Sequence, residues 1–319
     1  MAARRASRQL QRRFEGLEPR TAAFRAALAR VGLPAWFVAI DLLWVANPAV
    51  LGIDARHYQR AAHAWLAGGD PWAVAEAGVP YAAGPHTLLF YAPTSWLPLP
   101  LATALWMGLG LAASVWLVRR LGMPAWWLLF PPLAHAIWNA NPQTLMLALL
   151  VLGTPVAGAL AAGLKLYALL PLVFHWRRLL VALVVLAATA VVLPWQLYLD
   201  QGLGVGSHLG TAWNGSAWRF PILIPPVLAA LWVLRDREAQ WYAVPAIFPA
   251  TQFYYVSTVL PALVGRPVLG AVLAAPVPLL APVVLIVLAL RVVLRERPGW
   301  RRAAARPGEG SPAPTSSPR

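Results

Sequence analysis

The stretch PLPLATALWMGLGLAASVWLV, residues 98–118, carries no charged side chain. As a helix rising 1.5 Å per residue it is long enough to cross the ~30 Å hydrocarbon layer of a bilayer. Further apolar segments recur on both sides of it, at 33–51, 121–138, 142–153, 154–176, 179–198, 220–234, 241–264 and 267–290. The sequence therefore predicts an all-α fold, a polytopic membrane helical bundle of about eight transmembrane spans, or nine.

The composition argues against an ordinary soluble enzyme. Of the 319 residues, 60% are hydrophobic and 12% are charged, whereas a soluble domain carries about 25% charged residues. The net charge of +15 comes largely from the two ends, with eight Arg in 4–30 and six in 291–306. Basic flanks beside apolar spans indicate cytoplasmic ends rather than nucleic-acid binding. The chain has no Cys, which excludes disulfides and thiolate chemistry.

Three parts follow from this pattern. We expect a basic cytoplasmic segment at 1–32, a membrane domain at 33–291, and a tail at 292–319 that is basic and then disordered. The protein is expected to be a multi-pass protein of the inner (plasma) membrane, with both termini in the cytoplasm.

The Arg-rich connections then assign the loops to sides. Arg119–Arg120, Arg177–Arg178 and Arg235–Arg237 are expected inside, and 52–97, 199–216 and 262–266 outside. Three apolar segments lie between Arg120 and Arg177, so either one of them is a half-span or the charge rule fails locally. We favour 142–153, which is only about 18 Å long as a helix.

The largest expected outer loop, 52–97, begins with an amphipathic pattern. Apolar or small residues recur at a spacing of three to four, opposite a polar face: Ala55, Tyr58, Ala62, Trp65 and Leu66 against Arg56, His57, Gln59, Arg60 and His63. This predicts a helix lying in the membrane surface. Gly68–Gly69 and then Pro71 are expected to end it.

The chain has eleven acidic residues, few enough to consider one by one. Asp41 lies inside the first span, where an acid is a functional suspect or a partner of a neighbouring helix. Asp70 lies in Gly-Asp-Pro-Trp, a turn sequence. Asp54 directly follows the first span, so it is either the N-cap of the next helix or a catalytic carboxylate at the membrane boundary. The two roles are compatible.

Four motifs resemble, in order, those of glycosyltransferase family 87, which are GT-C-type polyprenyl-phosphate-dependent sugar transferases. They span residues 52–198, nearly half the chain, and four positions depart from the family pattern: Trp72, Ala92, Pro142 and Ala168. The motifs are Ile53-Asp54-Ala55-Arg56-His57-Tyr58 with Gly68-Gly69-Asp70-Pro71-Trp72, then Phe90-Tyr91-Ala92-Pro93, then Asn141-Pro142-Gln143, and then Gly163-Leu164-Lys165-Leu166-Tyr167.

The resemblance implies transfer of a hexose, mannose first among them, from a polyprenyl-phosphate donor to an acceptor hydroxyl of a glycolipid or glycan at the outer face. It implies inversion at the anomeric carbon, with Asp54 as the general base. The candidates for binding the donor phosphate are Arg56, His57, Lys165, His86 and His208. The candidates for contacting the sugar or the acceptor are Tyr58, Tyr91, Gln143 and Trp213.

Several of these residues also have a plainer interpretation. Lys165, the only Lys in the chain, could extend to the membrane interface instead of lining a cavity. His57 could be solvated, His86 and His208 could be ordinary loop residues, and the aromatic residues could form an interfacial belt.

No cofactor is expected, since the sequence has no Asp-x-Asp pair, metal-ligating cluster or nucleotide-binding fingerprint. Dependence on a divalent cation is left open. The lipid bilayer and the two substrates are the expected partners, and nucleic acid is not. The competing classes are a non-catalytic polyprenyl-phosphate-sugar binding protein and a lipid-linked-sugar transporter, which paired broken helices in two repeats would favour.

Overall fold

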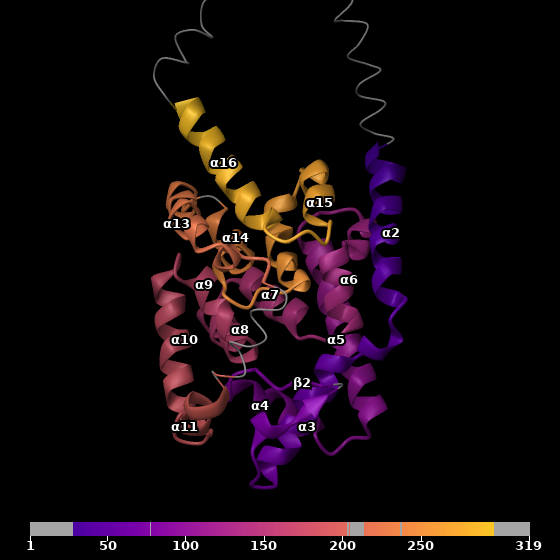
Figure 1. The fold of residues 1–319 in the computed structure, drawn as a ribbon, viewed down its shortest axis with the longest axis vertical. Helices are drawn as coiled ribbons and strands as arrows, with labels where there is room; N and C mark the ends of the chain where they lie inside the picture. The colour runs from indigo at the N-terminus through magenta and orange to yellow at the C-terminus, as the bar shows by residue number, and fades with distance from the viewer. Residues whose placement is uncertain (1–27, 77, 203, 205–213, 237, 297–319) are drawn as a thin grey trace, which may run out of the picture.

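The described part of the chain is mostly helical (Figure 1). The computed structural model describes residues 28–76, 78–202, 204, 214–236 and 238–296. Within these ranges the strands are one antiparallel pair, β1 (Ala75–Glu76) with β2 (Val79–Pro80). The expected all-α class is confirmed.

The α-helices run in chain order as α2 (Leu33–Val45), α3 (Ile53–Leu66), α4 (His86–Tyr91), α5 (Leu99–Arg120), α6 (Pro131–Trp138), α7 (Gln143–Leu152), α8 (Pro155–Leu164), α9 (Leu169–Leu172), α10 (Trp176–Thr189), α11 (Trp195–Leu197), α13 (Ile224–Val233), α14 (Ala239–Ile247), α15 (Pro267–Leu273) and α16 (Leu280–Glu296). Two π-helical turns lie at Leu28–Gly32 and Tyr198–Gly202. Short 3-10 helices connect the others, at Pro48–Val50, Pro71–Ala73, Ala92–Thr94, Ala125–Leu129, Leu166–Ala168 (η6), Ala217–Arg219, Pro221–Leu223 and Phe253–Leu263 (η10).

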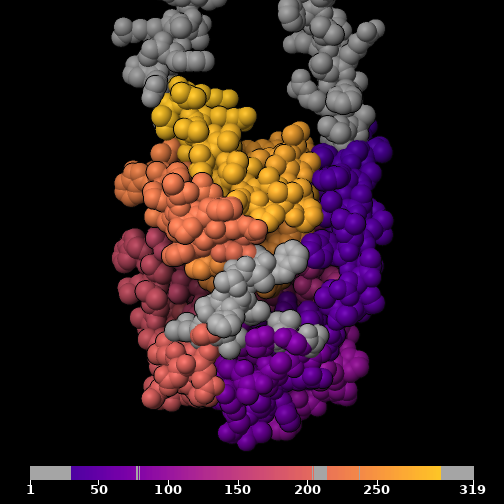
Figure 2. Space-filling model, viewed as in Figure 1, coloured from indigo at the N-terminus to yellow at the C-terminus, as the bar shows by residue number. Residues whose placement is uncertain are grey.

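The molecule has two distinct ends along its long axis. The beginning of α2 and the end of α16 lie at one end, and α3, α4 and α11 lie at the other (Figure 1). In the space-filling view the yellow and orange C-terminal helices lie at the upper end, the indigo α2 runs along their side, and the purple elements lie at the lower end (Figure 2). The two described ends of the chain therefore lie at the same end of the molecule, on different sides of it, and α3 lies at the opposite end (Figure 1).

Most of the helices are shorter than the predicted spans. By length and composition, one described helix could cross a membrane, Leu99–Arg120. A second candidate is the bent pair Arg30–Val45 and Pro48–Leu66, whose two parts meet at 84°. Eight continuous spanning helices are thus not supported by the described residues. The 179–198 segment is broken after Thr189, where α10 ends, and resumes as the short α11 at Trp195–Leu197. The 267–290 segment is two helices separated at Ala274–Leu279.

The 154–176 segment is a helical hairpin and not a crossing. Lys165 has extended backbone angles (φ −150°, ψ 117°), which end α8, and the chain then returns through η6 and α9. The two ends of the segment lie together, because a Cβ placed on Gly153 would be 3.2 Å from the guanidinium of Arg178. The predicted half-span 142–153 does form a short apolar helix, α7, so the chain has a further short segment beside it. The reversal lies in the next segment, at its one charged residue.

The 241–264 segment is a second hairpin. Helix α14 ends at Ile247, two residues before Pro249, and η10 packs back against it. The residue before a proline is disfavoured in the α region, which helps to end the helix. The carboxylate of Glu238 and the guanidinium of Arg266 form an ion pair at the base of this hairpin. Glu238 and Arg266 therefore lie side by side, which contradicts the assignment of the connections that hold them to opposite sides.

Candidate functional site

The start of α3 is held by the turn that follows α6. The Gly52 amide donates to the Trp138 carbonyl at 2.8 Å, and the Asp54 amide donates to the Asn139 carbonyl at 3.0 Å. Gly52 is the N-cap, with a left-handed φ of 65°, and no side chain caps the helix. The N-cap interpretation of Asp54 is therefore wrong, and its carboxylate is available for another role.

The Asp54 side chain is fixed by one strong hydrogen bond. Asn141 donates from Nδ2 to Oδ2 of Asp54 at 2.7 Å. Burial raises the pKa of the Asp54 carboxyl, against the lowering effects of Lys165, the Asn141 hydrogen bond, His57 and Arg56. A carboxyl with a raised pKa is a stronger base once it is ionised.

The amphipathic pattern of 53–66 predicts one buried face on α3, but the helix is buried over more of its surface than that. Arg60 and His63 are exposed as expected, whereas His57 and Gln59 are buried. Gln59 donates to the carbonyls of Thr94 and Leu97 at 2.9 and 2.7 Å. The expectation of a helix with one solvated polar face at the membrane surface is therefore wrong at these two positions.

Lys165 brings a buried cation to the same place. Its side chain is 6% exposed, and Nζ donates to the hydroxyl of Tyr58. Nζ also lies 4.7 Å from the ring centroid of Tyr58 and 6.0 Å from that of Tyr167. The hydrogen bond to oxygen and the nearby aromatic rings compensate part of the cost of burying an ammonium. Of the two interpretations of Lys165, the structure supports the one that places it in a cavity.

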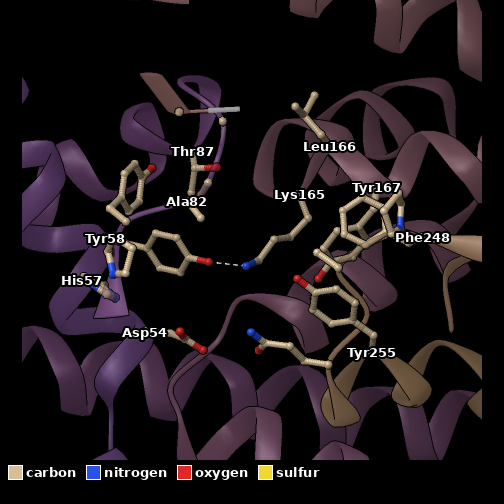
Figure 3. A pocket seen from close by; sticks show the side chains of 18 of the residues that line it. Asp54, His57, Tyr58, Ala82, Thr87, Lys165, Leu166, Tyr167, Phe248 and Tyr255 are labelled. Carbon is tan, nitrogen blue, oxygen red and sulfur yellow. Dashed lines mark hydrogen bonds between the residues drawn. The ribbon is translucent and has the colours of Figure 1, made fainter. Parts of the chain in front are cut away.

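These groups line one cavity of about 430 Å³ (Figure 3). Asp54, His57 and Tyr58 reach it from α3, and Lys165 reaches it from the tip of the first hairpin. The tip of the second hairpin forms another wall, with Phe248, Pro249, Ala250, Gln252, Tyr254 and Tyr255. Among the described lining residues, the one carboxyl group is that of Asp54 and the one Lys or Arg side chain is Lys165.

The wall is rich in phenol groups. Six of the eight tyrosines of the chain line the cavity: Tyr58, Tyr81, Tyr167, Tyr198, Tyr254 and Tyr255. A tyrosine offers an apolar ring face and a hydroxyl that donates and accepts. Such a wall suits a ligand with both C–H faces and hydroxyls, which is the chemistry of a sugar.

Four of the predicted site residues lie outside the cavity lining. Arg56 is bound to Glu76, with Nε 2.9 Å from Oε1, and to backbone carbonyls. Tyr91 stacks on Trp106 with ring centroids 4.0 Å apart. Gln143 accepts from the Tyr167 hydroxyl and donates to Ser257 at 3.2 Å. These contacts give Arg56, Tyr91 and Gln143 structural partners in place of a ligand.

The fourth is His86, which is 1% exposed and stacks on Trp195. Neither ring nitrogen has a hydrogen-bond partner among the described residues. Burial, with Lys165 nearby, lowers the pKa of His86 to about 3. The ring is therefore neutral at physiological pH and carries no charge for a phosphate.

The remaining candidates, His208 and Trp213, lie outside the described residues. In the described ranges, no three His, Asp or Glu side chains come together as metal ligands, and dependence on a cation stays untested. Asp70 builds a turn, as expected, by accepting from the Trp72 amide at 2.8 Å.

Sequence reasoning missed part of the site. The motif at Asn141-Pro142-Gln143 does not indicate that Asn141 binds Asp54, and none of the four motifs includes Tyr254 or Tyr255. The run Phe253-Tyr254-Tyr255 was a usable signal, because adjacent tyrosines in an apolar segment need polar partners.

Comparison of the chain with models of protein families, with curated proteins and with solved structures gave no match.

Proposed function

We propose that this chain is an integral-membrane glycosyltransferase that moves a hexose from a polyprenyl-phosphate donor to an acceptor hydroxyl at the outer face, with inversion. The observation that carries the proposal is that Asp54 and Lys165 face one tyrosine-lined cavity. The reaction needs a base to remove the acceptor proton and a cation to stabilise the leaving phosphate, and this pocket contains a candidate for each.

In the proposed step, the acceptor oxygen attacks the anomeric carbon while Asp54 removes the hydroxyl proton. The new bond joins that oxygen to the carbon, and the bond from the carbon to the phosphate oxygen breaks. The electron pair leaves with the polyprenyl phosphate. Proton removal by a positioned base and stabilisation of the growing phosphate charge both lower the barrier.

Lys165 is the residue that we assign to the leaving phosphate. Its ammonium donates to the Tyr58 hydroxyl and lies near the Tyr167 ring, so it is oriented before a ligand binds. His57 lines the same cavity and lies three residues after Asp54 on α3. It is the second donor that we assign to the phosphate.

The outer surface supports a membrane location for the proposed enzyme. Large apolar side chains are exposed along α5, α10, α13 and α16, and Val191 and Ile222 are 90% and 84% exposed. A soluble protein rarely exposes so much contiguous apolar surface. We propose a polytopic GT-C-like bundle in which short and broken helices take the place of some of the eight predicted spans. Irregular backbone is tolerated at membrane depth where protein or a cavity covers it.

The test is Asp54→Asn in purified protein, assayed for transfer from polyprenyl-phosphate mannose to a glycolipid acceptor. We expect the rate to fall by on the order of 10²–10⁴-fold, the usual contribution of a positioned base. The amide has nearly the shape of the carboxylate and can still accept from Asn141, so the fold should persist.

The matched control is Asp70→Asn. Asp70 belongs to the same loop but builds a turn, which Asn also builds, so this variant should transfer at the wild-type rate. Wild-type transfer by Asp54→Asn would contradict the assignment of Asp54 as the base.

A second candidate function is transport of the lipid-linked sugar without chemistry. The observation that favours it is that the tips of two broken-helix hairpins meet at the cavity, an arrangement also found in transporters. Movement of the labelled donor between the leaflets of reconstituted vesicles, without transfer to any acceptor, would select this function.

A further inference from the structure

We propose that Asn141 is a positioning residue for Asp54: its amide holds Oδ2 and leaves Oδ1 to take the proton from the acceptor. This inference rests on the proposed function, because it assigns a task to the base of that reaction. Asn141 itself does not line the cavity, so it acts through the carboxylate.

The orientation of the Asn141 amide follows from its second contact. Oδ1 of Asn141 accepts from the backbone amide of Gln143 at 2.9 Å. The group that remains to face Asp54 must then be the NH₂, which donates to Oδ2 at 2.7 Å. Both the oxygen and the nitrogen of this amide therefore have hydrogen-bond partners, and Asn141 is 2% exposed. A donor fixed in this way favours the ionised form of the carboxylate.

The backbone of the turn adds to this hold. The Asn139 carbonyl accepts from the Asp54 amide, and the Trp138 carbonyl accepts from Gly52. Ala140 has a φ of 52°, a left-handed conformation that is unusual for a residue with a Cβ. The turn at 138–141 thus binds both the main chain and the side chain of Asp54. Backbone in a rare conformation that the surroundings hold in place is frequent at functional sites.

Several other titratable groups interact electrostatically with Asp54, and a pH experiment must keep them constant. They come from four elements and from the residue after α8: Arg56, His57 and Tyr58 on α3, Tyr91 at the end of α4, Lys165, Tyr167 on η6, and Tyr254 and Tyr255 on η10. Substitutions at Asn141 leave all of them in place.

Two variants separate the hydrogen bond from the turn. Asn141→Asp keeps the shape and the acceptor for Gln143 but presents a second acid to Asp54. Asn141→Ser keeps an acceptor for the turn but is too short to reach Asp54. Like charges raise the pKa of a carboxyl, as does loss of a donor to its ionised form. We therefore expect the acid limb of the rate profile to move to higher pH in both variants, by about one unit or more in Asn141→Asp.

The second readout does not depend on transfer. The infrared carboxyl band of Asp54, identified by its loss in Asp54→Asn, should titrate at higher pH in both Asn141 variants. At neutral pH we expect transfer to fall by on the order of 100-fold in Asn141→Asp, because a misplaced catalytic group is that costly. Raising the pH should restore part of this loss.

The matched control is Asn214→Asp. Asn214 is also buried, and its Oδ1 accepts from the Ser216 amide at 2.9 Å in the same kind of turn, but it does not line the cavity. This variant should leave the Asp54 band and the rate profile unchanged.

The outcomes separate the two proposals. If the Asn141 variants transfer sugar with the wild-type pH profile and an unmoved Asp54 band, the positioning role is overturned and the glycosyltransferase proposal stands. If the wild-type protein transfers no sugar but the band moves in both variants, the proposed function fails, and Asn141 still controls the carboxyl.

Discussion

At the scale of single residues, the same burial has opposite effects on two side chains near the cavity. It raises the pKa of Asp54 and lowers the pKa of His86 to about 3, because the charged form of each is the one that loses solvent. Asp54 has a donor in Asn141 and a cation nearby, so its ionised form is partly compensated. His86 has no such partner among the described residues. Because its ionised form has partners, Asp54 is a candidate base, whereas His86 is a neutral residue of the packed interior.

The buried neutral His86 predicts a pH-dependent stability. Its folded pKa lies below the unfolded value of about 6.5, so the unfolded chain binds a proton that the folded chain does not. Stability from this residue is therefore full above pH 6.5 and is lost as the pH falls toward 3. In His86→Phe, which can keep the stacking on Trp195, the loss of stability between pH 7 and pH 5 should be smaller by on the order of 2 kcal/mol.

Thermal unfolding of both proteins in detergent at pH 5 and pH 7 measures this difference. An identical pH dependence in His86→Phe and the wild type would contradict a neutral buried His86.

At the scale of elements, apolar runs predicted where helices form but not where the chain turns back. A run that crosses a bilayer and a run that reverses halfway have the same composition. The reversals depend on details that hydropathy does not weigh, such as the extended backbone at Lys165 and the helix end before Pro249. The ion pair between Glu238 and Arg266 could not be predicted either, because it joins residues that the charge pattern assigns to opposite sides.

This hairpin geometry can be tested by cross-linking, because the chain contains no Cys. Glu238→Cys combined with Arg266→Cys should react with a short bismaleimide, and mass spectrometry should find the joined peptides. The matched control pairs Glu238→Cys with His63→Cys, whose α3 lies at the other end of the molecule (Figure 1), and should give no cross-link. Cross-linking of the control pair alone would refute the hairpin.

At the scale of the whole molecule, the site is assembled from segments far apart in the chain. The sequence led to Asp54, Tyr58 and Lys165 through a local motif and through the rarity of acids and lysines. It could not place Asn141 or Tyr255 beside them, because these contacts join residues 87 positions apart or more. Arg56 shows the opposite error. Its position on the polar face of α3 suggested a phosphate ligand, and the structure pairs it with Glu76.

The proposed orientation predicts which surfaces a reagent can reach in intact cells. His63→Cys, near the α3 end, should react with an impermeant maleimide from outside. Val264→Cys lies two residues from Arg266, at the base of the second hairpin, and should react only after the cells are permeabilised. The unmodified chain serves as the blank. Labelling of Val264→Cys in intact cells would contradict the orientation.

The broken helix at Lys165 also bears on how such a protein is made. In the proposed membrane setting, a hairpin with an ammonium at its tip is stable at depth only beside the groups that cover it. One of those groups, Tyr58, is synthesised earlier in the chain, whereas the second hairpin, with Tyr254 and Tyr255, comes later. We therefore expect α8 and α9 to insert only after α3 is in place. The cavity should close only when the last third of the chain has left the ribosome.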